Sequence, residues 1–102
     1  MNATVSARHC DISDELRQRA AAIIDRLASL LHRPVDGTVV FDVAPQLATA
    51  EIRLHGGGGE SYIATGEDKD HRSALDRAEE RIRRQLEKNE SSRRGRGAKD
   101  TV

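Results

Sequence analysis

The chain has 102 residues, enough for one domain, and its 17 Lys and Arg balance 17 Asp and Glu to a formal net charge of zero. One Phe, one Tyr and no Trp leave an aliphatic, Ala-rich core, with stability expected toward the low end of the usual ~5–15 kcal/mol. The single cysteine, Cys10, excludes an internal disulfide, and neither an apolar run of about 18 residues nor a signal-peptide pattern occurs, so a cytoplasmic protein is expected.

The first third of the chain predicts a strand followed by a helix. The segment "ATVSA", residues 3–7, is β-branched at alternate places and predicts the first strand. The segment "ISDELRQRAAAIIDRLASLLHRP" begins with Ser13 as a helix N-cap, carries two acids in its first turn and ends before Pro34. Its apolar face at helical spacing consists of Leu16, Ala20, Ile23, Ile24, Leu27, Leu30 and Leu31.

Three more strands are predicted in the middle of the chain. The segments "VDGTVVFDVA", residues 35–44, and "LATAEIRLH", residues 47–55, both alternate apolar with polar side chains. The segment "ESYIATG", residues 60–66, predicts the last strand, beyond four consecutive glycines. The short connections favour an antiparallel meander of these three strands. The side chains expected on the buried face are Val39, Phe41, Val43, Ala48, Ala50, Ile52 and Leu54.

A second helix is predicted from about residue 69 to residue 89, with a buried stripe formed by Leu75, Ala78, Ile82 and Leu86. The element order is therefore β-α-β-β-β-α, and the apolar stripes of both helices need a sheet face to cover. This order predicts an α+β fold, a two-layer sandwich of a four-stranded sheet with two helices packed on one face. The domain should span residues 1–90, and residues 91–102 should form a disordered basic tail, because they have little apolar content.

Charge is unevenly distributed along the chain. Residues 77–102 carry nine Lys and Arg against five Asp and Glu, whereas residues 1–76 carry eight against twelve. On the second predicted helix the cations gather on one flank, and most acids gather on the other. Like charges four positions apart destabilise a helix, so the clustering indicates an anionic partner; an ordinary solvated face is the alternative. The cations of this flank are Arg77, Arg81, Arg84 and Lys88.

Other basic residues extend this surface. Arg19, Arg26 and Arg33 are seven positions apart and line one edge of the first helix, so that two helices lying side by side would present a joint basic surface. The tail adds Arg93 and Arg94 on a flexible tether, which can contact phosphate without a fixed conformation. Because aromatic side chains for base stacking are few, phosphates and shape should be recognised rather than base sequence.

The segments "ARHCDISDELRQRA" and "EDKDHRSALDRAEERIRRQLEK" resemble the ribosome hibernation promoting factor family, also called ribosome-associated translation inhibitors. The resemblance covers residues 2 to about 90. It implies a domain shaped like double-stranded RNA binding domains that binds the small ribosomal subunit, through 16S rRNA and ribosomal proteins, near the decoding centre. There it blocks the mRNA and tRNA sites and inhibits translation. The positions matching the family's rRNA contacts are Arg26, Arg81, Arg84 and Lys88.

The chain also departs from the family pattern. Where the family has Asp-Met-Tyr, this sequence has Asp70, His71 and Arg72, and two first-helix positions that are often basic are Ile23 and Ser29. The alternative is therefore a divergent paralogue. It would act as a protein-interaction module, engaging a protein partner through the acidic flank and an open sheet edge, or as a general RNA-binding protein.

No pattern in the sequence indicates catalysis, a metal site or a cofactor. The segment "HGGGGES" lacks the Gly-Lys-Ser/Thr ending of a phosphate-binding loop and predicts a hairpin connection instead. The acids of "GEDKDH" stand at a helix start, where cap and dipole favour them over a Mg²⁺ site. None of the four histidines is paired at ligand spacing. We therefore expect a non-enzyme without a small-molecule substrate.

Overall fold

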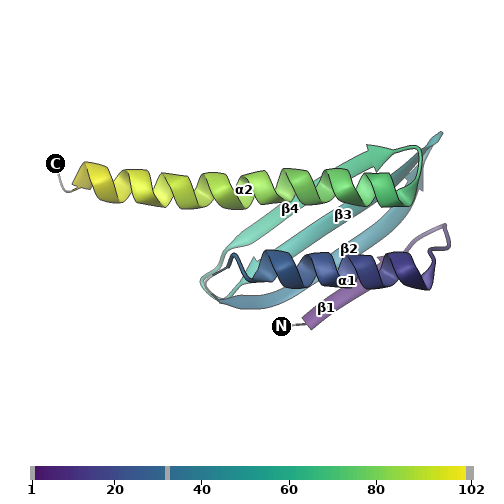
Figure 1. Ribbon diagram of the computed structural model, residues 1–102, viewed down its shortest axis with the longest axis horizontal. Helices are drawn as coiled ribbons and strands as arrows, with labels where there is room; N and C mark the ends of the chain where they lie inside the picture. Colours follow the sequence, from purple (N-terminus) through teal and green to yellow (C-terminus); the bar gives the residue numbers. More distant parts are fainter. Residues whose placement is uncertain (1, 32, 101–102) are drawn as a thin grey trace.

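The computed structural model describes the backbone of residues 2–31 and 33–100, and the side chains of these residues except 34, 35 and 89–100. Both helices lie on the same face of a twisted four-stranded sheet (Figure 1). This arrangement confirms the predicted two-layer α+β fold. In chain order the elements are β1 (Asn2–Ala7), α1 (Asp14–Ala28), β2 (Pro34–Ala44), β3 (Leu47–Gly56), β4 (Ser61–Asp68) and α2 (His71–Asp100).

The sheet is mixed and has the strand order β1-β2-β3-β4. β1 pairs in parallel with β2, Val5 opposite Val39, because α1 carries the chain back to the starting end of the sheet. β2, β3 and β4 form the predicted antiparallel meander. α1 therefore covers β1 and β2, and α2 covers β3 and β4, so that each helix lies above one edge of the sheet.

The core between the helices and the sheet is aliphatic, with Phe41 as its one fully buried aromatic side chain among the described residues. All four residues of the predicted α2 stripe, Leu75, Ala78, Ile82 and Leu86, are buried. The alternating residues Ala48, Ala50, Ile52 and Leu54 of β3 are buried as well. Local periodicity therefore located most of this core correctly.

Two predicted core residues are exposed instead. α1 ends at Ala28 rather than just before Pro34, because the hydrogen bonds beyond it change to a tighter turn: Leu30 N–H donates to Leu27 O and Leu31 N–H to Ala28 O, both at 3.0 Å. Leu30 therefore lies beyond the helix and is 47% exposed. Val43 is also 47% exposed, since the β2–β3 turn extends past the start of α2 (Figure 1).

α2 begins at His71, where the Asp70 carboxylate accepts a hydrogen bond from Ser73 N–H at 2.8 Å in the manner of an N-cap. Its backbone is helical to Asp100 rather than to residue 89, and no proline interrupts this stretch. The side chains of residues 89–100 lie outside the described part, so the disordered basic tail remains a prediction. Among the described residues, no helix is both long and apolar enough to cross a membrane.

The glycines of the β3–β4 connection and of β4 serve different purposes. The connection is the predicted hairpin: Gly56 N–H donates to Glu60 O at 2.9 Å, and Gly59 has a φ of 82°. Gly66 instead lies directly under α2. A Cβ at that position would lie 2.1 Å from Ala74 O and 2.6 Å from Ala78 N, so only glycine lets the helix backbone rest on β4.

We predict that Gly66→Ala destabilises the domain by about 3 kcal/mol, because the added methyl group must push α2 away from the sheet. Urea unfolding followed by circular dichroism measures the change. Gly58→Ala is the matched control, since its Cβ would meet only Glu60 Oε1, at 4.0 Å, and should change stability by less than about 0.5 kcal/mol. Equal stability of the two variants would contradict the close approach at Gly66.

Candidate nucleic-acid interface

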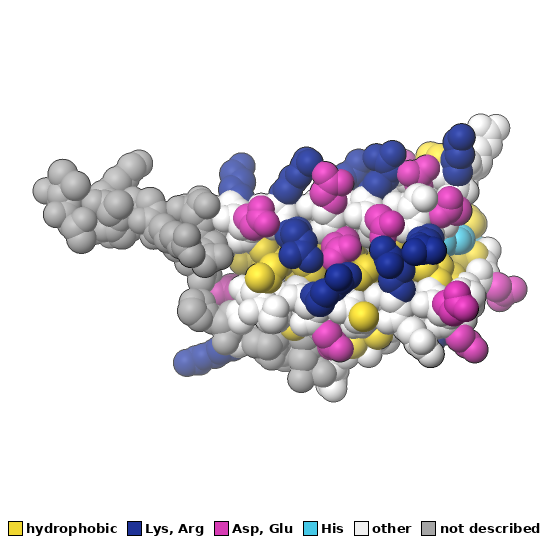
Figure 2. All heavy atoms as spheres, in the orientation of Figure 1, with side chains coloured by type: hydrophobic (Ala, Val, Ile, Leu, Met, Phe, Trp, Pro, Cys, Tyr) yellow, Lys and Arg dark blue, Asp and Glu magenta, His cyan; other side chains and the backbone are white. Residues whose placement is uncertain are grey.

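The face that carries both helices presents two rows of Lys and Arg side chains, with acidic side chains between them (Figure 2). One row follows the flank of α2 above the free edge of β4, and the other lies along the seam between α1 and α2. We call them the outer row and the seam row. The outer row contains Arg77, Arg81, Arg84 and Lys88, and the seam row contains Arg19, Arg26, Arg72 and Arg83.

The outer row is anchored to β4 at one end and free at the other. Arg77 Nε pairs with Asp68 Oδ2 at 2.7 Å, and Arg81 Nη1 donates to Thr65 O at 2.5 Å. Arg84 Nη2 pairs with Glu80 Oε1 at 2.6 Å one turn away, but both side chains are more than 60% exposed, so the pair is weak. Lys88 has no ion pair with any residue that the structure describes. The cations best placed to reach a ligand are therefore Arg84 and Lys88.

The edge carbonyls of the sheet are bonded to side chains from the helices above. Thr65 O accepts from Arg81, and Ile63 O accepts from Gln85 Nε2 at 2.7 Å. At the opposite edge, Val5 O accepts from Arg17 Nη1 at 2.8 Å. These contacts occupy acceptors that an added strand would use. The structure therefore weakens the alternative in which an open sheet edge binds a protein partner.

The seam row is held by acids of α2. Arg19 Nη2 pairs with Asp76 Oδ1 at 2.7 Å, which ties α1 to α2. Glu79 Oε2 accepts from two arginines at once, Arg26 at 3.4 Å and Arg83 at 3.1 Å. Glu79 is only 16% exposed, so its carboxylate sits inside the seam and fixes both guanidinium groups around one oxygen. A phosphate would be bound in the same way, with its oxygens accepting from several arginines.

The structure separates some residues that the sequence grouped together. Arg19 and Arg26 lie in the seam, as their spacing predicted, but Arg33 does not follow them, because α1 ends five residues earlier. Arg33 lies instead at the glycine turn, where its backbone carbonyl accepts from Gly57 N–H at 2.6 Å. Arg93 and Arg94 lie outside the residues with described side chains. The two basic edges share one face, as predicted, but the α2 acids divide them.

Sequence reasoning missed Arg72 and Arg83 as members of the seam row. Arg83 has the helical phase of the α2 acids and not that of the basic flank, and this phase brings it to Glu79. Arg72 was seen only as a departure from the family pattern. Its position at the start of α2, one turn before Asp76, is the signal that would have placed it beside Arg19.

A small α+β domain with cations gathered on its helical face is typical of nucleic-acid-binding domains. The fold and the two cation rows place this chain in that class. Residues 3–94 match the family described as Sigma 54 modulation protein / S30EA ribosomal protein, and the chain belongs to this family. Its members are non-enzymatic ribosome-binding factors, so the expectation of a non-enzyme is confirmed. The resemblance stated from the sequence is confirmed as well.

Two solved structures have similar folds. The N-terminal domain of Protein Y from Thermus thermophilus has a TM-score of 0.73 and 28% sequence identity, covering 86% of this chain and 98% of that one. A ribosomal subunit interface protein from Coxiella burnetii has a TM-score of 0.71 at 16% identity, covering 89% and 99%. The second likeness supports the fold alone. No curated protein matches the chain.

The Arg77–Asp68 pair predicts a pH effect. The hydrogen bond from Arg77, followed by that from the Lys69 backbone N–H, lowers the pKa of Asp68. A carboxyl group whose pKa is lowered in the folded state stabilises that state above its unfolded pKa of about 3.9, and this contribution disappears as pH falls through the folded pKa. We predict that Arg77→Gln raises the pKa of Asp68 toward its ordinary value, as measured by an NMR titration of the carboxyl carbon.

Arg84→Gln is the matched control for this titration. It removes one cation from the same row, but Arg84 pairs with Glu80 and not with Asp68. The Asp68 pKa should therefore stay as in the wild type. If Arg77→Gln also left the Asp68 pKa unchanged, Arg77 would not be engaged with β4 in solution.

Proposed function

We propose that this protein is a cytoplasmic hibernation factor that binds the small ribosomal subunit through 16S rRNA phosphates near the decoding centre. In that position it blocks the mRNA and tRNA sites and inhibits translation. The observation that carries the proposal is the presence of two cation rows on one face of a domain from a ribosome-binding family. The description of the matched family, which names a ribosomal protein, agrees with this partner.

The geometry of the rows suits a nucleic-acid backbone. From Arg77 to Lys88 the outer row extends about 16 Å along the helix, at 1.5 Å per residue, which is long enough to follow several phosphates. The seam row runs beside it on the same face (Figure 2). With one Phe and one Tyr in the whole chain, the surface has little means of stacking on bases. Affinity should therefore come from phosphate contacts and depend steeply on salt.

The acids beside these cations do not prevent phosphate binding. They mean that a cation exchanges its carboxylate partner for a phosphate. Each guanidinium that turns to a phosphate leaves a carboxylate such as Asp76 or Glu80, which is exposed enough to be hydrated instead. Lys88 has no such partner among the described residues. The result is a neutral protein whose cations become available only where a dense array of phosphates competes with the acids. This favours ribosomal RNA over isolated anions.

We predict that the wild-type protein co-sediments with small ribosomal subunits at 50 mM salt and is released progressively toward 500 mM, because bound phosphates exchange with counterions. Arg84→Gln combined with Lys88→Gln removes two outer-row cations. Its affinity should fall about tenfold to fiftyfold at 0.1 M salt, and the slope of log affinity against log salt should fall by about 2.

Arg8→Gln combined with Arg53→Gln is the matched control, because it removes two cations from the sheet face opposite the helices. This control should bind like the wild type. Subunits preloaded with mRNA and tRNA should bind less of the protein, because these RNAs already fill the sites that the protein is proposed to occupy. Absence of wild-type binding at low salt would refute the proposed function, and an equal loss in both double variants would refute the helical face as the contact.

A further inference from the structure

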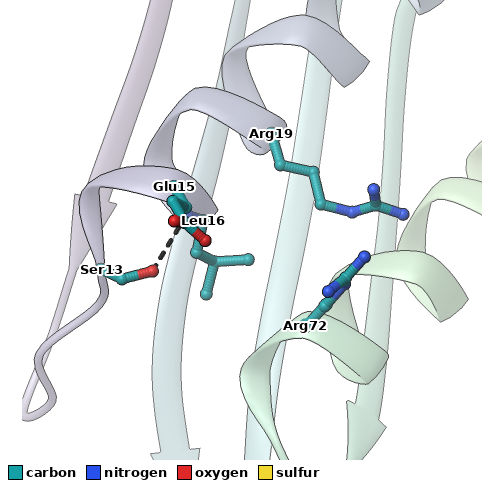
Figure 3. Close-up of a pocket in the computed structure, with 5 residues that line it drawn as sticks. All are labelled: Ser13, Glu15, Leu16, Arg19 and Arg72. Atoms are coloured by element: carbon teal, nitrogen blue, oxygen red, sulfur yellow. Dashed lines mark hydrogen bonds between the residues drawn. The ribbon is translucent and has the colours of Figure 1, made fainter.

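A cavity of about 320 Å³ lies between the first turns of α1 and α2, at one end of the seam row. Figure 3 shows Arg19 of α1 and Arg72 of α2 extending from opposite sides into the same space. Ser13, Glu15 and Leu16 complete the lining. Two guanidinium groups that converge repel each other unless an anion lies between them. The two converging guanidinium groups therefore favour a negatively charged ligand between them.

Both arginines have unused hydrogen-bonding capacity. Arg19 Nε is buried and has no hydrogen-bond partner in the described structure, although Nη2 of the same group is paired with Asp76. A buried donor without a partner is unfavourable and rare in folded proteins. Arg72 is exposed and forms no ion pair with any described residue. Asp76 also holds the Arg19 guanidinium in place, so the group is ordered before a ligand arrives.

The charges around the cavity indicate which anion fits. Arg19 and Arg72 bring two positive charges and Glu15 brings one negative charge, while Asp76, which pairs with Arg19, is not among the lining residues. A singly charged group matches this balance better than a doubly charged one. Ser13 Oγ accepts from Leu16 N–H at 3.1 Å, which leaves its hydroxyl hydrogen available to a ligand oxygen.

We propose that a phosphodiester group of the RNA backbone binds between Arg19 and Arg72. This inference rests on the proposed function and deepens it, because it assigns a contact to Arg72, a residue at which the chain departs from its family. The site lies at the end of the seam row that Arg19 and Arg72 form, near the start of α2. An RNA strand that follows the seam would place one phosphate at Glu79's two arginines and another, further along the strand, at this cavity.

The first test measures small-subunit affinity at several salt concentrations for Arg72→Gln and for Arg8→Gln, which removes one exposed cation from the opposite sheet face. Arg72→Gln should lower affinity about fivefold to tenfold at 0.1 M salt and reduce the salt slope by about 1. Arg8→Gln should leave both unchanged. Equal behaviour of the two variants overturns the proposal, while wild-type binding in the same experiment keeps the proposed function standing.

The second test follows the Arg19 Nε–Hε resonance by NMR, in separate titrations with inorganic phosphate and with a short RNA duplex. The duplex should shift this resonance in the wild type and not in Arg72→Gln. A shift with inorganic phosphate alone overturns the assignment to RNA, and no shift with either probe overturns the site itself. Because neither titration contains ribosomes, both results are independent of whether the wild type binds small subunits.

Discussion

The seating of α2 on β4 at Gly66 determines which charges this domain presents and where. Since no side chain separates the helix backbone from the strand there, α2 lies flat along the sheet edge, with one flank over β4 and the other against α1. Arg77 and Arg81 reach down to β4, whereas Asp76 and Glu79 reach across to α1. The basic face is thus a consequence of backbone packing.

The acids of α2 explain how a chain of zero net charge can carry a phosphate-binding surface. Asp76 and Glu79 pair with Arg19, Arg26 and Arg83 and order them in the seam. Ordering the long arginine side chains in advance lowers the entropic cost of binding, and the paired acids suppress binding to weak anions. Under the proposed function, Glu79, with two arginines on one oxygen, competes with a phosphate oxygen for them.

Local sequence patterns predicted the helix, strand and turn features that depend only on residues close together in the chain. The buried stripe of Leu75, Ala78, Ile82 and Leu86 follows from helical phase alone, and the glycine hairpin follows from backbone freedom. Arg33 was misplaced in the predicted line because α1 closes in a tight turn after Ala28, which apolar periodicity does not reveal. Pairs such as Arg19 with Asp76, 57 positions apart, arise only after folding, so the division of the basic surface was not predictable.

The most direct test of this account is to measure the affinity of the Glu79→Gln variant for small ribosomal subunits over a range of salt concentrations. If Glu79 stands where a phosphate oxygen binds, neutralising it releases Arg26 and Arg83 to RNA. The affinity should then rise about fivefold to tenfold at 0.1 M salt, with a salt slope steeper by about 1. An affinity equal to or below that of the wild type would show that Glu79 does not compete with RNA for these arginines, and would contradict the account.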